Sequence, residues 1–144
     1  MQVVFEQVEE KQQECALIKA VTRDEVVQSA IDILENGVVT LSVIRDDKTY
    51  LLKVGAIYYI ESVDKRTYIY TKDSCYETKL RLYELEDRLG GFFARCSKAM
   101  IVNLRKVKWV NAEIGGRLTA ELINGEHVVI ARSYVKDVKR RLEL

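Results

Sequence analysis

The 144-residue sequence predicts a mainly β (α+β) domain with two short helices, preceded by a small strand–helix segment. From residue 38 onward, short apolar segments typical of strands alternate with small and polar turn residues. Two segments of this region instead repeat apolar residues at helical spacing. We therefore predict an N-terminal extension, residues 1–37, and one domain, residues 38–144.

The extension is predicted to hold two strands and a helix. Its strands are VVFEQV (3–8) and CALIKAV (15–21). The S/T-x-x-E pattern of Thr22 to Glu25 is typical of a capping box at a helix N-terminus. Asn36-Gly37 predicts the helix end, after apolar residues at helical spacing: Val27, Ala30, Ile31 and Leu34. We expect this extension to pack on the domain or to mediate self-association.

The domain begins with strands that are joined by polar or glycine-containing turns. The predicted turns are Asp46-Asp47-Lys48, Asp64-Lys65, Lys72-Asp73-Ser74, Gly115-Gly116 and Asn124-Gly125. The small residues of the last turn suit the positive φ angles of type I′.

Both helices of the domain show one apolar face. The first has Leu82, Leu85 and Leu89 on that face and stops at Gly90-Gly91. The terminal helix, SYVKDVKRRLEL, turns Val135, Val138 and Leu142 inward, with Ser133 as its N-cap.

Composition excludes several classes of protein. No apolar run approaches the roughly 18 residues of a membrane span, and the acidic N-terminus lacks the pattern of a signal peptide. The three cysteines, Cys15, Cys75 and Cys96, are widely spaced, which argues against a zinc site or a disulfide framework. We predict a cytoplasmic protein with no metal and no membrane partner.

Charge is distributed unevenly along the chain. Residues 1–36 hold three Lys/Arg against eight Asp/Glu, whereas residues 92–144 hold 11 against five. A basic half attracts polyanions, although solubility alone produces the same bias.

The sequence offers no catalytic constellation and no cofactor cradle. Its one histidine, His127, has no evident partner, and no glycine-rich phosphate loop or nucleophile elbow is present. Cys96 stands beside Arg95 and Lys98, and nearby cations would lower its pKa, which leaves redox sensing as an alternative. We predict no catalytic residues, no cofactor and no small-molecule substrate.

Three polar corners interrupt the apolar pattern. In FFARCSKAMIVNL the insert RCSK is predicted to be a rigid loop that presents Ser97 and Lys98 to a base edge. Two further corners follow the same scheme: Lys65, Arg66 and Thr67 at a hairpin tip, and Arg132 with Ser133 at the start of the last helix. In the alternative, Lys98 is a solvated turn residue and Arg95 caps a core carboxylate.

Three stretches together resemble the LytTR (LytR/AlgR-type) DNA-binding domain of bacterial transcription regulators. They are IYYIESVDKRTYIYT, YETKLRLYELEDRLGGFFARCSKAMIVNLRKVKWV and LINGEHVVIARSYVKDVKRRL, within residues 40–144. The resemblance implies short antiparallel strands in small sheets, with loops that reach into successive major grooves. It places base contacts at Lys65 to Thr67, at Ser97 and Lys98, and at Arg132. Many members also carry a receiver domain, which 36 residues cannot build.

We therefore predict a non-enzymatic transcription regulator that binds double-stranded DNA as a homodimer. Ser133, as the cap of the last helix, and Lys136 complete the predicted DNA-binding set, and Lys136 and Lys139 are the candidate phosphate contacts. Asn103 is expected to cap backbone groups rather than to touch DNA. The alternative is a protein–protein interaction module in a signalling pathway, in which the basic corners are incidental.

Overall fold

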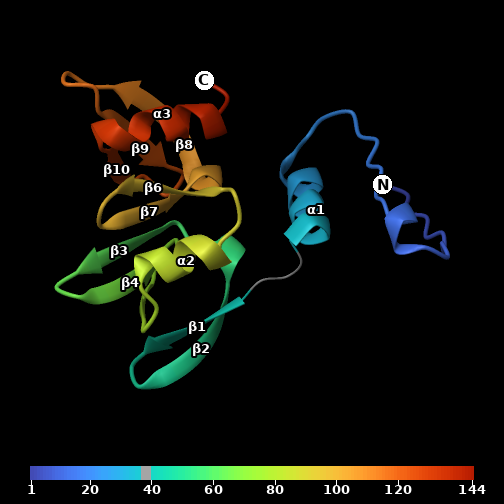
Figure 1. Ribbon diagram of the computed structural model, residues 1–144, viewed down its shortest axis with the longest axis horizontal. Coiled ribbons are helices and arrows are strands. Elements are labelled where there is room, and N and C mark those ends of the chain that lie inside the picture. The colour runs from blue at the N-terminus through green and yellow to red at the C-terminus, as the bar shows by residue number, and fades with distance from the viewer. Residues whose placement is uncertain (37–39) are drawn as a thin grey trace. The chain divides into compact units, whose positions relative to one another are not determined.

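The computed structural model describes residues 1–36 and 40–144 (Figure 1). The chain divides into two compact units, Met1–Val38 and Val39–Leu144. We refer to residues 1–36 as the N-terminal segment and to residues 40–144 as the C-terminal domain. No helix in these described ranges is long and apolar enough to cross a membrane.

The N-terminal segment contains the helix α1 (Glu25–Asn36) and a short 3-10 turn, η1 (Lys11–Gln13). Asp24 caps α1: its carboxylate accepts the Val27 N–H at 2.9 Å. The helix therefore starts from Asp24, and the predicted capping box from Thr22 is wrong. Gly37, the predicted stop of the helix, lies outside the described residues.

The two strands predicted in the N-terminal segment, residues 3–8 and 15–21, are also wrong. Neither stretch joins a strand ladder, and nearly all of their side chains are exposed, with Phe5 88% exposed. Their apolar pattern alone cannot make a strand, because a strand needs a partner to satisfy its backbone groups. The order of extended chain followed by a helix is retained.

The C-terminal domain is built on a seven-stranded antiparallel sheet with the strand order β2-β1-β5-β4-β3-β7-β6. Its strands are β1 (Thr40–Arg45), β2 (Lys48–Lys53), β3 (Tyr59–Val63), β4 (Arg66–Tyr70), β5 (Cys75–Thr78), β6 (Phe93–Ser97) and β7 (Met100–Asn103). The helix α2 (Leu82–Arg88) lies against this sheet. Its buried face, Leu82 and Leu85, packs with apolar residues of β1, β3, β4 and β7 in one core cluster.

A second, three-stranded sheet has the order β10-β9-β8. It comprises β8 (Val107–Ala112), β9 (Leu118–Leu122) and β10 (His127–Ile130), and α3 (Arg132–Arg141) follows it. The inner side chains of this sheet, the buried Val138 of α3 and residues of β6 and β7 form the other core cluster. The mainly β fold with two helices in the domain is as predicted from the sequence.

Most of the predicted turns are confirmed, with one difference in type. Asp46 and Asp47, and likewise Asp64 and Lys65, have positive φ angles, as a two-residue hairpin loop favours. In the β9–β10 hairpin only Gly125 has positive φ (89°), and its N–H donates to the Leu122 carbonyl. This is a type I turn followed by a left-handed glycine, so the predicted type I′ geometry is wrong there.

Candidate nucleic-acid interface

The first polar corner is the tip of the β3–β4 hairpin. Lys65 lies in the turn and is exposed. Arg66 opens β4 and pairs loosely with Glu77 of β5, at 3.8 Å between Nη1 and Oε1. Thr67 is only 6% exposed, because alternate residues of β4 face the core. Little of the Thr67 side chain is thus accessible to a ligand, which disfavours its predicted base contact.

The second corner is the turn between β6 and β7. Strand β6 continues through Ser97, so the predicted RCSK loop is shorter than expected and its apex is Lys98-Ala99. The Ser97 Oγ accepts the Ala99 N–H at 3.2 Å and thereby closes the turn. Lys98 is exposed. A register shift between Arg95 and Ser97 bends the strand just before the apex.

Arg95 explains why a basic residue stands in this apolar stretch. Its Nε pairs with Oε1 of Glu86 on α2 at 2.7 Å, and its Nη1 donates to the Lys98 carbonyl at 2.7 Å. Arg95 therefore joins the turn to α2 and leaves Lys98 as the outward-facing cation. The sequence alternative in which Arg95 caps a core carboxylate is therefore correct only in part. Arg95 does pair with a carboxylate, but the Glu86 side chain is 41% exposed and does not belong to the core.

Cys96 does not have the lowered pKa that its neighbours suggested. The side chain is fully buried, and its Sγ lies 3.6 Å from the Met100 carbonyl oxygen. Burial raises the pKa of Cys96 to about 12 and outweighs the attraction of Arg95. The thiol is therefore protonated at neutral pH, which removes the basis for redox sensing by this residue.

The third corner is the start of α3. Ala131 occupies the N-cap position, so Arg132 and Ser133 are the first two residues of the helix and both are exposed. Ser133 was predicted as the N-cap, and this is wrong: no side chain caps α3. The first N–H groups of the helix therefore have no side-chain acceptor at this end, which favours an anion there.

Backbone hydrogen bonds bring the three corners to one side of the domain. The Ser62 N–H donates to the Ala99 carbonyl at 2.8 Å, which sets the β3–β4 tip beside the β6–β7 tip. The Ala131 N–H donates to the Cys96 carbonyl at 2.7 Å, which sets the start of α3 beside β6. In Figure 1 both hairpin tips and the start of α3 lie on the left-hand side of the domain.

Asn103 holds the other end of the two hairpins together. It is 2% exposed; its Nδ2 donates to the Ile57 carbonyl at 2.8 Å, and its Oδ1 accepts the Arg105 N–H at 3.0 Å. These bonds confirm the expectation that Asn103 caps backbone groups. They also fix β7 against the chain that enters β3.

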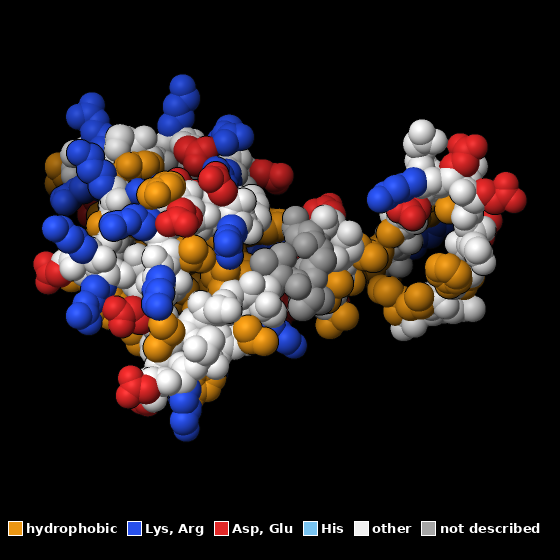
Figure 2. All heavy atoms as spheres, turned by 60° about the horizontal axis from the view of Figure 1, so that its bottom comes forward, with side chains coloured by type: hydrophobic (Ala, Val, Ile, Leu, Met, Phe, Trp, Pro, Cys, Tyr) orange, Lys and Arg blue, Asp and Glu red, His pale blue; other side chains and the backbone are white. Residues whose placement is uncertain are grey.

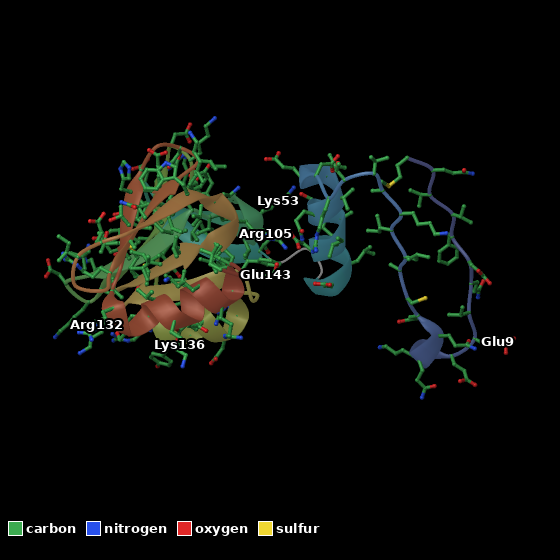
Figure 3. The ribbon with its side chains drawn as sticks, turned by 90° about the horizontal axis from the view of Figure 1, so that it is seen from above. Glu9, Lys53, Arg105, Arg132, Lys136 and Glu143 are labelled. Carbon is green, nitrogen blue, oxygen red and sulfur yellow. The ribbon has the colours of Figure 1, made fainter. Side chains whose placement is uncertain are left out.

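Helix α3 carries unpaired and paired cations on its exposed surface. Lys136 stands one turn after Arg132, and Figure 3 shows both on the same side of the helix. Asp137 instead binds Arg140 (2.6 Å) and Arg141 (2.9 Å), and these hydrogen bonds lower the pKa of its carboxyl group. Arg141 also donates to the Gly91 carbonyl at 3.0 Å and so anchors the end of α3.

Four predicted contact residues keep their charged groups free. Within residues 1–36 and 40–144, the side chains of Lys65, Lys98, Arg132 and Lys136 make no hydrogen bond or ion pair. Figure 2 shows many Lys and Arg side chains on the left-hand side of the domain, with a smaller number of acidic side chains between them. This side is suited to a polyanion.

Comparison with known proteins also indicates a domain that binds DNA. Residues 47–143 match the family model described as the LytTr DNA-binding domain. Uncharacterized HTH-type transcriptional regulators from Staphylococcus aureus strains NCTC 8325 and COL are each 29% identical over 99 residues, covering 69% of this chain and 67% of theirs.

A solved structure shows the same fold. It is described as the LytTr DNA-binding domain of a putative methyl-accepting/DNA response regulator from Bacillus cereus, with a TM-score of 0.69 and 24% identity. The match covers 73% of this chain and 97% of that one. Because the family model spans more than half of the sequence, the chain belongs to the LytTR family of DNA-binding domains.

Proposed function

We propose that this protein is a transcription regulator that binds double-stranded DNA sequence-specifically, through the major groove, in the bacterial cytoplasm. The observation that carries the proposal is the grouping of three exposed basic corners on one side of a LytTR domain. Regulation of this kind follows from occupancy of the DNA and needs no catalytic group and no cofactor.

Each corner has a distinct chemical task in this proposal. Arg132 donates a forked pair of hydrogen bonds to guanine O6 and N7, and Lys98 donates to the same kind of acceptor. Ser97 contacts a base or a phosphate next to Lys98. The β3–β4 tip contacts bases or phosphates through Lys65 and Arg66. Thr67 is left out because its side chain is buried.

Phosphate contacts supply the rest of the binding energy. The N–H groups at the start of α3 and the Ser133 hydroxyl lie at the N-terminus of the helix, where the helix dipole also favours negative charge, and Lys136 follows one turn later. Such contacts fix the register of the protein on the duplex but carry no sequence information.

The test separates base reading from phosphate binding on the same helix. A specific duplex is first selected from random DNA with the purified protein. Arg132→Ala should then weaken binding to it by about 1–3 kcal/mol and leave the affinity for random duplex nearly unchanged. Lys136→Ala should weaken both alike and reduce the salt dependence by about one phosphate contact.

Arg140→Ala is the matched control, because Arg140 belongs to the same helix but its guanidinium is paired with Asp137. Arg140→Ala should leave the affinities for the specific duplex and for the random duplex nearly unchanged. If Arg132→Ala binds both duplexes as the wild type does, Arg132 reads no base and the proposed reading mode fails.

We further propose that the protein acts as a homodimer on repeated half-sites, with the N-terminal segment in the dimer contact. Several apolar side chains of this segment are strongly exposed: Phe5 (88%), Leu17 (79%), Leu34 (61%) and Ile33 (53%). Apolar surface of this kind is characteristic of interaction sites. Sedimentation should give a dimer for the wild type and a monomer for Leu34→Asp, whereas a monomeric wild type would rule out the dimer.

A further inference from the structure

Arg132 rests on Gly116, a glycine that the sequence pattern predicts only as a turn residue. Gly116, in the β8–β9 turn, has φ of +86°. A Cβ atom placed on it would lie 3.2 Å from Cγ, 3.4 Å from Cδ and 3.5 Å from Nε of Arg132. The stem of Arg132 therefore lies directly over the bare backbone of Gly116.

The turn beneath Arg132 is itself fixed. The Glu113 N–H donates to the Arg117 carbonyl at 2.9 Å, and the Gly116 N–H donates to the Glu113 carbonyl at 3.3 Å. The neighbouring Gly115 has a similar φ of +92°, but a Cβ there would meet no atom within 4 Å. Only one of the two left-handed glycines therefore contacts the arginine.

We propose that Gly116 is a positioning residue that sets the DNA sequence specificity of Arg132. The inference deepens the proposed function and rests on it, since it takes Arg132 as a base-reading residue. It assigns to the β8–β9 turn, which belongs to a different sheet from the two hairpin tips, a part in recognition.

The physical reason is preorganisation. An arginine side chain has several rotatable bonds, and a forked contact with guanine requires one orientation of its guanidinium group. Within the described residues no hydrogen bond or ion pair orders the guanidinium of Arg132. Packing of the aliphatic stem on Gly116 restricts it before DNA arrives, so less conformational entropy is lost on binding.

A matched pair of variants tests this proposal. Gly116→Ala and Gly115→Ala place the same methyl group on the same kind of left-handed backbone, so both should lower thermal stability to a similar extent. Only Gly116→Ala pushes against Arg132. We expect the ratio of specific to random duplex affinity to fall about 5-fold or more in Gly116→Ala and to stay at the wild-type value in Gly115→Ala.

The double variant Gly116→Ala/Arg132→Ala shows whether the effect passes through the arginine. Its affinity ratio should equal that of Arg132→Ala alone. If either alanine variant does not fold, Gly116→Asn and Gly115→Asn replace the pair, because asparagine tolerates positive φ better than alanine. The same comparison then applies.

The outcomes separate the two proposals. If Arg132→Ala lowers the affinity ratio and the variants at positions 115 and 116 behave alike, the role of Gly116 is overturned and the proposed function stands. If Arg132→Ala leaves the ratio unchanged, the base-reading role of Arg132 fails, and the role of Gly116 fails with it.

Discussion

Replacement of Asn103 by alanine should destabilise the domain strongly without touching the DNA-binding side. The substitution removes the bond from Nδ2 to the Ile57 carbonyl, which is buried, and the bond from the Arg105 N–H to Oδ1, which is partly buried. The Ile57 carbonyl and the Arg105 N–H then both lose their side-chain partner. Water cannot easily replace that partner, because Asn103 is 2% exposed.

The size of the effect follows from these two bonds. A hydrogen bond contributes about 0.5–1.5 kcal/mol net, and a buried group left without a partner costs about 1–3 kcal/mol. We expect the free energy of unfolding to fall by about 2–4 kcal/mol. This is a large fraction of the total free energy of unfolding of a typical domain, about 5–15 kcal/mol. With a urea slope of about 2 kcal/mol per M, the unfolding midpoint should fall by about 1–2 M.

Urea unfolding followed by far-ultraviolet circular dichroism measures this change. Asn111→Ala is the control: Asn111 lies on β8 and is exposed, so its midpoint should stay close to that of the wild type. A midpoint for Asn103→Ala within about 0.3 M of the wild type would mean that the two backbone groups find other partners and that Asn103 does not stabilise the domain in this way.

Two further predictions concern the β6–β7 hairpin. Arg95→Ala removes the link between Glu86 and the Lys98 carbonyl, so the domain should stay folded while specific duplex affinity falls by about 1 kcal/mol; unchanged affinity in the same titration would contradict the positioning role. At pH 8 a thiol reagent should modify Cys15 and Cys75, which are exposed, and reach the buried Cys96 only after unfolding.

The raised pKa of Cys96 also predicts a pH dependence of stability. Above pH 9 the thiol ionises in the unfolded chain, but in the folded protein burial keeps it protonated up to a pKa of about 12. Stability should therefore fall as pH rises from 9 to 12. Cys96→Ala should show a smaller fall between pH 8 and 10 in urea unfolding, and equal slopes for the two proteins would contradict this.

The features that were predictable from the sequence are those set by neighbouring residues. The Asp64-Lys65 hairpin and the amphipathic pattern of α3 depend on contacts within a few positions, and both are confirmed. Thr67 was predicted to lie at a solvent-facing tip because the sequence does not show where the hairpin turn ends and the strand begins. Successive side chains of β4 point to opposite faces of the sheet, so Arg66 faces solvent and Thr67 faces the core.

Contacts between distant elements were not predictable. Glu86 meets Arg95 from a helix, and Gly116 meets Arg132 from another sheet; neither pair has a spacing that a local pattern would reveal. The strands predicted at residues 3–8 and 15–21 are absent for a related reason, because strand formation depends on a partner as well as on apolar residues.

Methylation interference at guanine N7 on the selected duplex shows whether separate corners on one side of the domain read the major groove together. The wild type should show interference at separate positions on one face of the duplex. Arg132→Ala and Lys98→Ala should each lose a different one of them. If both variants keep every position of interference, or if the wild type shows none, the corners do not read the major groove.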